Sequence, residues 1–274
     1  MFLRGFFLLT AALVPLALQA QVRPAEDECE VGAPRVCVRH VLQDEGHILT
    51  SPLHVRPGDL LWIVPFGLAT GVAIDYDAHA LRSLGHDPQR ETDFRRVSDI
   101  GGIYLPIGSV VAGYGLGSFR QDDYLKQTAV LAGEAMADSA ILNEGLKYAI
   151  NRETPRQGDG TGRFWPHGTR TWPDGQSMPS NHAIITWSFA HVVADRYPSW
   201  HTKLLVYGLA TTVSASRVMS RDHFPSDVLV GSTLGYLIGG YVAHKRGEIS
   251  KSFSFSMMDT ANGRGMQLSY NFNH

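Results

Sequence analysis

Most of this 274-residue chain consists of apolar stretches of helical length, and this pattern constrains the fold more than any other feature. Gly, Pro and charged residues separate the stretches, as is typical of the ends of helices. The pattern predicts helices over residues 58–75, 97–115, 125–151, 181–196, 201–219 and 225–245. Because each helix must bury its apolar side against a neighbour, we predict an all-α helical bundle over residues 58–248.

The two ends of the chain differ from this body. Residues 1–20 combine a positive charge at Arg4 with an apolar run and a small residue at Ala20, which is typical of a secretory signal peptide. Residues 21–57 are polar and predict an irregular segment. Residues 249–274 alternate apolar and polar side chains around Asn262-Gly263, which predicts a short C-terminal β-hairpin.

Export decides how the two cysteines are interpreted. An oxidising compartment allows Cys29 and Cys37 to form a disulfide across a turn-prone segment, so we predict this pair and a periplasmic location. The uncharged run 100–119 is long enough to span a bilayer but contains many glycines and a proline, so membrane association stays as the alternative. Lys and Arg total 24 against 26 Asp and Glu, which excludes the overall basic charge of a nucleic-acid-binding protein.

One chemically informative segment runs from Ser216 to Asp227. Pro225 suits the first position of a helix, where its missing N–H costs nothing. His223 then lies just ahead of that helix and Asp227 in its first turns, so the two side chains can meet. A carboxylate that accepts one ring N–H leaves the other ring nitrogen basic, as a nucleophile requires. The alternative is a histidine that only satisfies a helix end.

A second segment, Pro179-Ser180-Asn181-His182, precedes an apolar helical run. Ser180 suits the N-cap, and the N–H groups after it would point outward at the positive end of the helix dipole, which makes an anion site. His182 could protonate a leaving oxygen, because a bound phosphate dianion would raise its pKa. A plain capping motif with an incidental histidine is the alternative.

Two cations complete the predicted site. Lys147 lies near the end of a predicted helix, and Arg217 can bind two phosphate oxygens at once. The transition state of phosphoryl transfer spreads charge over three oxygens, so its catalysis depends on positioned donors and cations. The alternative is two ordinary surface cations.

Together these segments resemble the type 2 phosphatidic acid phosphatase (PAP2) superfamily, which includes bacterial acid phosphatases, lipid phosphate phosphatases and vanadium haloperoxidases. Its signature is Lys-x6-Arg-Pro, then Pro-Ser-Gly-His, then Ser-Arg-x5-His-x3-Asp. The third element is complete here, and the order of the three is right. The resemblance covers roughly residues 147–227.

The resemblance implies a metal-independent phosphatase with a helical bundle of the PAP2 and haloperoxidase type. In this family pattern His223 is the nucleophile, Asp227 orients it, and His182 protonates the leaving group. The phosphoryl oxygens would be bound by Lys147, Ser180, Arg217 and the backbone N–H of Asn181. No metal or other cofactor is implied, although vanadate could occupy the site as a phosphate mimic.

The sequence departs from the family signature at two positions. Asn181 replaces glycine, which we explain by the readiness of Asn to adopt positive φ. Thr154 stands where the family has arginine, so one phosphate-binding cation is missing. Arg152 or Arg156 could reach the same oxygens, or Thr154 could supply a neutral hydrogen bond; our hypothesis is that Arg156 compensates.

The expected substrate is a phosphorylated small molecule or a lipid phosphate or diphosphate. A vanadate-dependent haloperoxidase is an alternative, which peroxidase activity appearing only with vanadate and peroxide would reveal. A non-catalytic envelope protein with the same fold is another. The sequence does not determine the oligomeric state.

Overall fold

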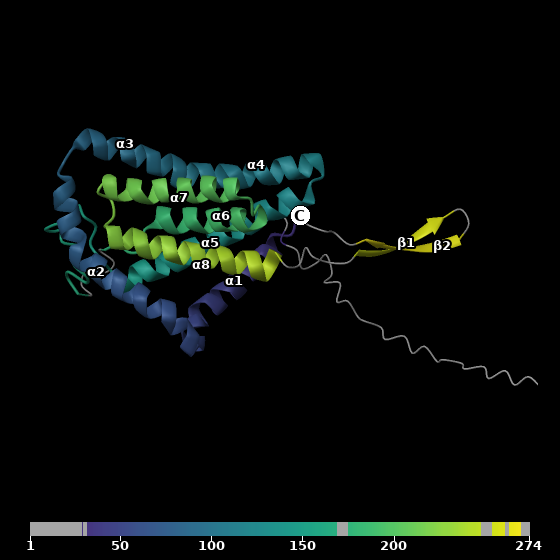
Figure 1. The fold of residues 1–274 in the computed structure, drawn as a ribbon, viewed down its shortest axis with the longest axis horizontal. Helices are drawn as coiled ribbons and strands as arrows, with labels where there is room; N and C mark the ends of the chain where they lie inside the picture. Colours follow the sequence, from purple (N-terminus) through teal and green to yellow (C-terminus); the bar gives the residue numbers. More distant parts are fainter. Residues whose placement is uncertain (1–28, 30–31, 169–174, 248–253, 261–262, 270–274) are drawn as a thin grey trace, which may run out of the picture.

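The computed structural model describes residues 29, 32–168, 175–247, 254–260 and 263–269, and these ranges are mainly helical (Figure 1). The all-α fold predicted from the apolar pattern is confirmed. The α-helices of the described ranges are α1 Pro34–Thr50, α2 Leu60–Leu84, α3 Pro88–Asp99, α4 Leu105–Arg120, α5 Asp123–Ile150, α6 Asn181–Arg196, α7 Trp200–Met219 and α8 Pro225–Gly247. Short 3-10 helices at Ser51–His54 and Pro57–Asp59 precede α2, and a π-helical turn, Ile100–Tyr104, joins α3 to α4.

Local sequence signals explain where several helices begin and end. The side chain of Asp87 accepts hydrogen bonds from two backbone N–H groups at the start of α3, and Pro88 occupies the first helical position. Asp122 caps α5 in the same way, and α5 ends at Asn151 in a left-handed conformation with a φ of 44°. Helix α8 begins at Pro225, as the sequence predicts.

Helices α5, α6 and α8 form the centre of the bundle, and α7 and α4 lie outside them (Figure 1). The side chains that meet there are small or branched and apolar, so they fill the space between closely packed helices. This cluster consists of Leu131, Ala132, Ala135, Leu142, Ile184, Val192, Ile238, Val242 and Ala243.

Glycines on α8 bring its backbone unusually close to α6. Gly231, Gly235 and Gly239 recur every four residues and therefore share one side of the helix. A Cβ atom placed on Gly235 would lie 2.2 Å from the carbonyl oxygen of Ile184. The same substitution at Gly231 would place a Cβ 2.8 Å from the carbonyl oxygen of Ser180. This approach holds the first turn of α6 beside the first turn of α8.

The segment 21–57, predicted to be irregular, contains helix α1, so that prediction is wrong. The reason is that the buried side of α1 is polar: it carries His40, Asp44 and Glu45. His40 Nδ1 lies 2.9 Å from Oε1 of Glu134 on α5, and Asp44 binds the ammonium of Lys245 at 2.9 Å. Because α1 docks through polar pairs, a search for apolar periodicity cannot detect it.

Two predicted helix boundaries also need correction. Helix α2 continues nine residues beyond the predicted end at Asp75, to Leu84. The predicted helix 97–115 is divided between the polar helix α3, the π-helical turn and α4. Asp77, just beyond the predicted end, is fully buried and bound to a guanidinium described below.

The disulfide and the hairpin are features of the two ends. Cys29 and Cys37 are joined by a disulfide. Strands β1 Ser254–Thr260 and β2 Gly263–Ser269 pair antiparallel, with Ser254 opposite Ser269. The predicted signal peptide, residues 1–20, lies outside the described residues.

Two helical stretches, Pro57–Leu84 and Pro88–Arg120, are long and apolar enough to cross a membrane, judged by length and composition. Much of their apolar surface has no partner within the described ranges. Leu61 and Val72 on α2 are 82% and 70% exposed, and Phe119 on α4 is 86% exposed.

We predict that Gly235→Ala lowers the free energy of unfolding by about 1–3 kcal/mol, because the added methyl group must push α6 and α8 apart. The control is Gly145→Ala on α5, where an added Cβ meets nothing within 4 Å. That change should leave stability unchanged or raise it, since alanine favours the helix by up to about 1 kcal/mol. Thermal unfolding of both variants tests this. Equal stability of the two variants would contradict the close packing.

Candidate active site

The three informative segments of the sequence meet at one end of the bundle. The backbone N–H of Ser180, ahead of α6, donates to the carbonyl of Asp227 on α8 at 3.1 Å. The charges that act on the His182 ring come from Arg217, His223, Asp222 and Lys147. The end of α5, the start of α6 and the connection from α7 to α8 therefore build one site.

His223 has a defined tautomer. Its ring is buried, and Nδ1 lies 2.7 Å from the carbonyl oxygen of Ser177. Because a carbonyl oxygen can only accept a hydrogen bond, Nδ1 carries a proton, and in the neutral imidazole Nε2 then has the free lone pair. The predicted partner, Asp227, is more distant, with Oδ2 3.8 Å from Nδ1. The acceptor of the Nδ1 proton is therefore the Ser177 carbonyl, which the sequence interpretation missed.

Asp227 instead organises the chain around His223. Its Oδ2 accepts from the hydroxyl of Ser177 at 2.6 Å and from the backbone N–H of Phe224 at 2.8 Å. Burial alone would raise the pKa of this carboxyl, but the His223 ring, the Arg152 guanidinium and the Ser177 hydroxyl hold it below its ordinary value. An ionised Asp227 therefore fixes the segments on both sides of the His223 ring.

Arg152 binds the carboxylate of Asp227 and so stabilises this arrangement. Its side chain is fully buried, with Nη1 2.7 Å from Oδ1 of Asp227 and Nη2 2.7 Å from Oδ2 of Asp77. Asp77 also accepts from the backbone N–H of Ser226 at 3.0 Å. The idea that Arg152 could replace the missing phosphate-binding cation is therefore wrong, because its guanidinium is already bound between two carboxylates.

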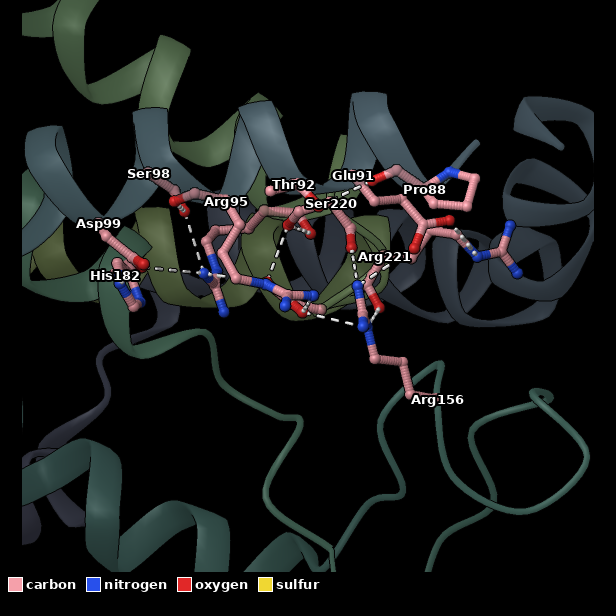
Figure 2. A network of polar contacts seen from close by, with 12 residues as sticks. Pro88, Glu91, Thr92, Arg95, Ser98, Asp99, Arg156, His182, Ser220 and Arg221 are labelled. Carbon is pink, nitrogen blue, oxygen red and sulfur yellow. Dashed lines mark hydrogen bonds and ion pairs between the residues drawn. The ribbon is translucent and has the colours of Figure 1, made fainter. Parts of the chain in front are cut away.

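His182 lies in the first turn of α6 and faces helix α3. Its Nε2 is 3.2 Å from Oδ1 of Asp99, the last residue of α3 (Figure 2). Burial, reinforced by the positive charge of Arg217, lowers the pKa of His182 to about 3. This imidazole is therefore neutral at neutral pH.

Two buried donors of the site have no hydrogen-bond partner among the described residues. They are Nε of Arg217 and the hydroxyl of Ser180, the N-cap residue of α6. Arg217 is held in place through Nη1, which donates to the hydroxyl of Ser98 at 3.0 Å and lies 3.2 Å from Oδ2 of Asp222. Because buried polar groups are nearly always satisfied, unpartnered donors beside a helix N-terminus indicate an anion site.

Lys147 and Asn181 border the same space. The ammonium of Lys147 is mostly buried, lies 3.3 Å from Oε1 of Glu144, and contributes to the lowered pKa of His182. Asn181 is the first residue of α6 and has helical backbone conformation, so no positive φ is needed there. The reason proposed from the sequence for tolerating Asn181 is thus wrong. Its side chain accepts from Asn143 at 3.4 Å instead.

Thr154 and Arg156 lie in the loop after α5. The backbone N–H of Thr154 donates to the side chain of Gln157 at 2.8 Å. The guanidinium of Arg156 reaches Oε2 of Glu91 at 3.2 Å, the carbonyl of Ser220 at 2.7 Å and Oδ1 of Asp222 at 3.2 Å. Figure 2 shows Arg156 approaching this network from the loop side. Arg156 is therefore connected to Arg217 through the shared carboxylate of Asp222.

Helix α3 contributes a row of site residues that the sequence interpretation missed (Figure 2). Arg95 forms two hydrogen bonds to Asp222, at 2.9 and 3.1 Å, Ser98 binds Arg217, and Asp99 contacts His182. Burial alone would raise the pKa of Asp222, but Arg95 and Arg217 hold it below its ordinary value. The sequence signal that could have pointed to these residues of α3 is Asp222, a charged residue inside the third motif.

Residues 128–250 match the PAP2 superfamily. The fold is similar to a crystal structure of the first transmembrane PAP2 type phosphatidylglycerolphosphate phosphatase from Bacillus subtilis, with 19% identity, a TM-score of 0.49, and coverage of 68% of this chain and 96% of that one. It is also similar to a crystal structure of Aquifex aeolicus LpxE, with 16% identity, a TM-score of 0.44, and coverage of 61% and 94%. No curated protein matches the chain. The match to the PAP2 superfamily spans residues 128–250, which include all three informative segments.

Proposed function

We propose that this protein is a metal-independent phosphatase that hydrolyses phosphate monoesters through a phosphohistidine intermediate on His223. The observation that carries the proposal is the hydrogen bond from Nδ1 of His223 to the Ser177 carbonyl. In the neutral imidazole it leaves the lone pair on Nε2, in a buried ring that shares the site with the unpartnered donors of Arg217 and Ser180. Activation of a nucleophile needs such a fixed, basic nitrogen.

In the proposed reaction, the Nε2 lone pair of His223 forms a bond to phosphorus and the ester P–O bond breaks. His182 gives its proton to the departing alkoxide oxygen, so an alcohol leaves. Water then forms a bond to phosphorus while the P–Nε2 bond breaks and its electron pair returns to Nε2; a water proton passes to His182, and inorganic phosphate leaves. Atoms and charge balance as hydrolysis of one ester bond by one water.

His182 needs a proton for the first step, although its pKa is low in the empty site. A bound phosphate dianion opposes the positive charge of Arg217 that helps to lower this pKa. The anion therefore raises the pKa of His182, and substrate binding takes up the proton that the leaving group later receives.

The charge of the transition state would be stabilised by groups already in place. Nε of Arg217 and the hydroxyl of Ser180 are the unpartnered donors, and α6 points its N-terminus at the same space. Lys147 and the backbone N–H of Asn181 would bind further oxygens. Preorganised donors of this kind supply the largest share of catalysis in phosphoryl transfer.

The exposed apolar helices favour a lipid phosphate or diphosphate as the substrate. The apolar side chains on α2 and α4 that lack partners in the described structure would be stable against acyl chains. We therefore propose that the helical body associates with a membrane, with export to the periplasm as the proposed location. Soluble phosphomonoesters remain the other variant of the same chemistry.

We predict that His223→Ala lowers the hydrolysis of p-nitrophenyl phosphate by about 10⁴-fold or more, because the nucleophile is lost. Wild-type activity should be unaffected by EDTA. The matched control is His201→Ala, an exposed histidine at the start of α7, which should retain full activity. Full activity of His223→Ala would overturn the mechanism.

We predict that Arg156→Ala lowers kcat/KM for a phosphomonoester about tenfold, which corresponds to about 1.4 kcal/mol of transition-state stabilisation. Removing this guanidinium frees Asp222 to draw Arg217 away from the phosphate. The control is Arg96→Ala, because Arg96 is exposed on α3 and, among the described residues, forms an ion pair only with Asp93, at 3.8 Å. An unchanged kcat/KM in Arg156→Ala would show that Thr154 needs no compensation.

A further inference from the structure

Asp99 places a carboxylate against two groups of the candidate active site. Its Oδ1 lies 3.2 Å from Nε2 of His182 and 3.7 Å from Nη1 of Arg217. Under the proposed function these two groups must instead face the substrate phosphate. The Asp99 side chain is 43% exposed, whereas His182 and Arg217 are nearly buried, so the carboxylate reaches the site from the solvent side.

The backbone holds Asp99 at this point. The π-helical turn Ile100–Tyr104 begins immediately after it, and single π-helical turns occur often at functional sites. A Cβ on Gly102 of this turn would lie 2.8 Å from Cδ2 of His182, and one on Gly101 would lie 2.7 Å from the side chain of Val213. The two glycines therefore allow the turn to pack directly on α6 and α7.

Neighbouring residues of α3 fix the helix over the site. Arg95, one turn before Asp99, binds both carboxylate oxygens of Asp222, and Ser98 accepts from Arg217 (Figure 2). These contacts involve buried or half-buried atoms. The contact of Asp99 is different, because a single exposed carboxylate in a long ion pair is held only weakly.

We propose that Asp99 is an internal competitor that occupies the phosphate position in the empty enzyme and thereby sets the affinity of the site for anions. A carboxylate resembles part of a phosphoryl group, since both present anionic oxygens to the same donors. It leaves Nε of Arg217 and the hydroxyl of Ser180 without partners. A phosphate has enough oxygens to bind these donors as well, so it displaces Asp99.

Displacement has two consequences for the reaction. The Nε2–H of His182, now directed at Asp99, becomes available to the phosphate ester. The Asp99 carboxylate must rotate towards solvent, because its negative charge would repel the bound dianion. Substrate, product phosphate and vanadate should all compete with the same side chain.

The test is Asp99→Asn and Asp99→Ala, assayed for KM and for competitive inhibition by inorganic phosphate. Without the competing charge, the KM and the inhibition constant of phosphate should both fall about three- to tenfold, while kcat does not rise. Tighter binding cannot result from misfolding, so this readout separates the proposal from a structural role of Asp99.

Asp93→Asn is the matched control, because it removes the same charge from α3 at an exposed position bound only to Gln89 and Arg96 among the described residues. Its KM and inhibition constant should equal those of the wild type. Unchanged or weaker phosphate binding in both Asp99 variants would overturn the proposal. So would a lower kcat with unchanged KM, which would make Asp99 a positioning residue for His182.

This inference rests on the proposed function, but the two can fail separately. Suppose that the wild-type enzyme is active, that His223→Ala is inactive, and that the Asp99 variants bind phosphate as the wild type does. Only the competitor role of Asp99 is then wrong. If the wild-type enzyme neither hydrolyses phosphomonoesters nor binds phosphate, both are wrong.

Discussion

The buried guanidinium of Arg152, held between Asp77 and Asp227, connects the parts of the chain that form the site. Asp77 belongs to α2, Arg152 to the loop after α5, and Asp227 to α8. A charge in such surroundings is stable only when its partners are complete, and loss of one partner typically costs about 3–5 kcal/mol. Because Asp227 also binds Ser177 and the backbone beside His223, the same contacts fix the position of His223.

The polar groups around the site divide into those already satisfied and those left free. Arg152, Arg156 and Arg95 are bound by carboxylates, and the positions of Arg217 and His223 depend on these bonds. By contrast, Nε of Arg217 and the hydroxyl of Ser180 have no partner in the described structure. A rigid, satisfied surrounding with a few free donors is the arrangement that preorganised electrostatic catalysis requires.

The parts of this arrangement that could be predicted are those encoded by local sequence. Pro225 begins α8 and Ser180 occupies the N-cap position of α6. The apolar periodicity predicts α5 and α6 to within two residues at each end. Helix α1 could not be predicted, because its buried side is polar. The Ser177 carbonyl could not be predicted, because a backbone acceptor is not visible in the pattern of side chains. The roles of Asp77, Asp99 and Arg95 could not be predicted either, because each residue contacts a partner that is distant in the sequence.

We propose that Nε2 of His223, with a free lone pair, faces an anion site built by Arg217, Ser180 and the start of α6. A crystal structure with orthovanadate tests it most directly, because vanadate adopts the geometry of the phosphoryl transition state. The account predicts vanadium bonded to Nε2 of His223, with vanadate oxygens bound by Nε of Arg217 and the hydroxyl of Ser180. Vanadate bonded to His182, or bound without contact to His223, would contradict it.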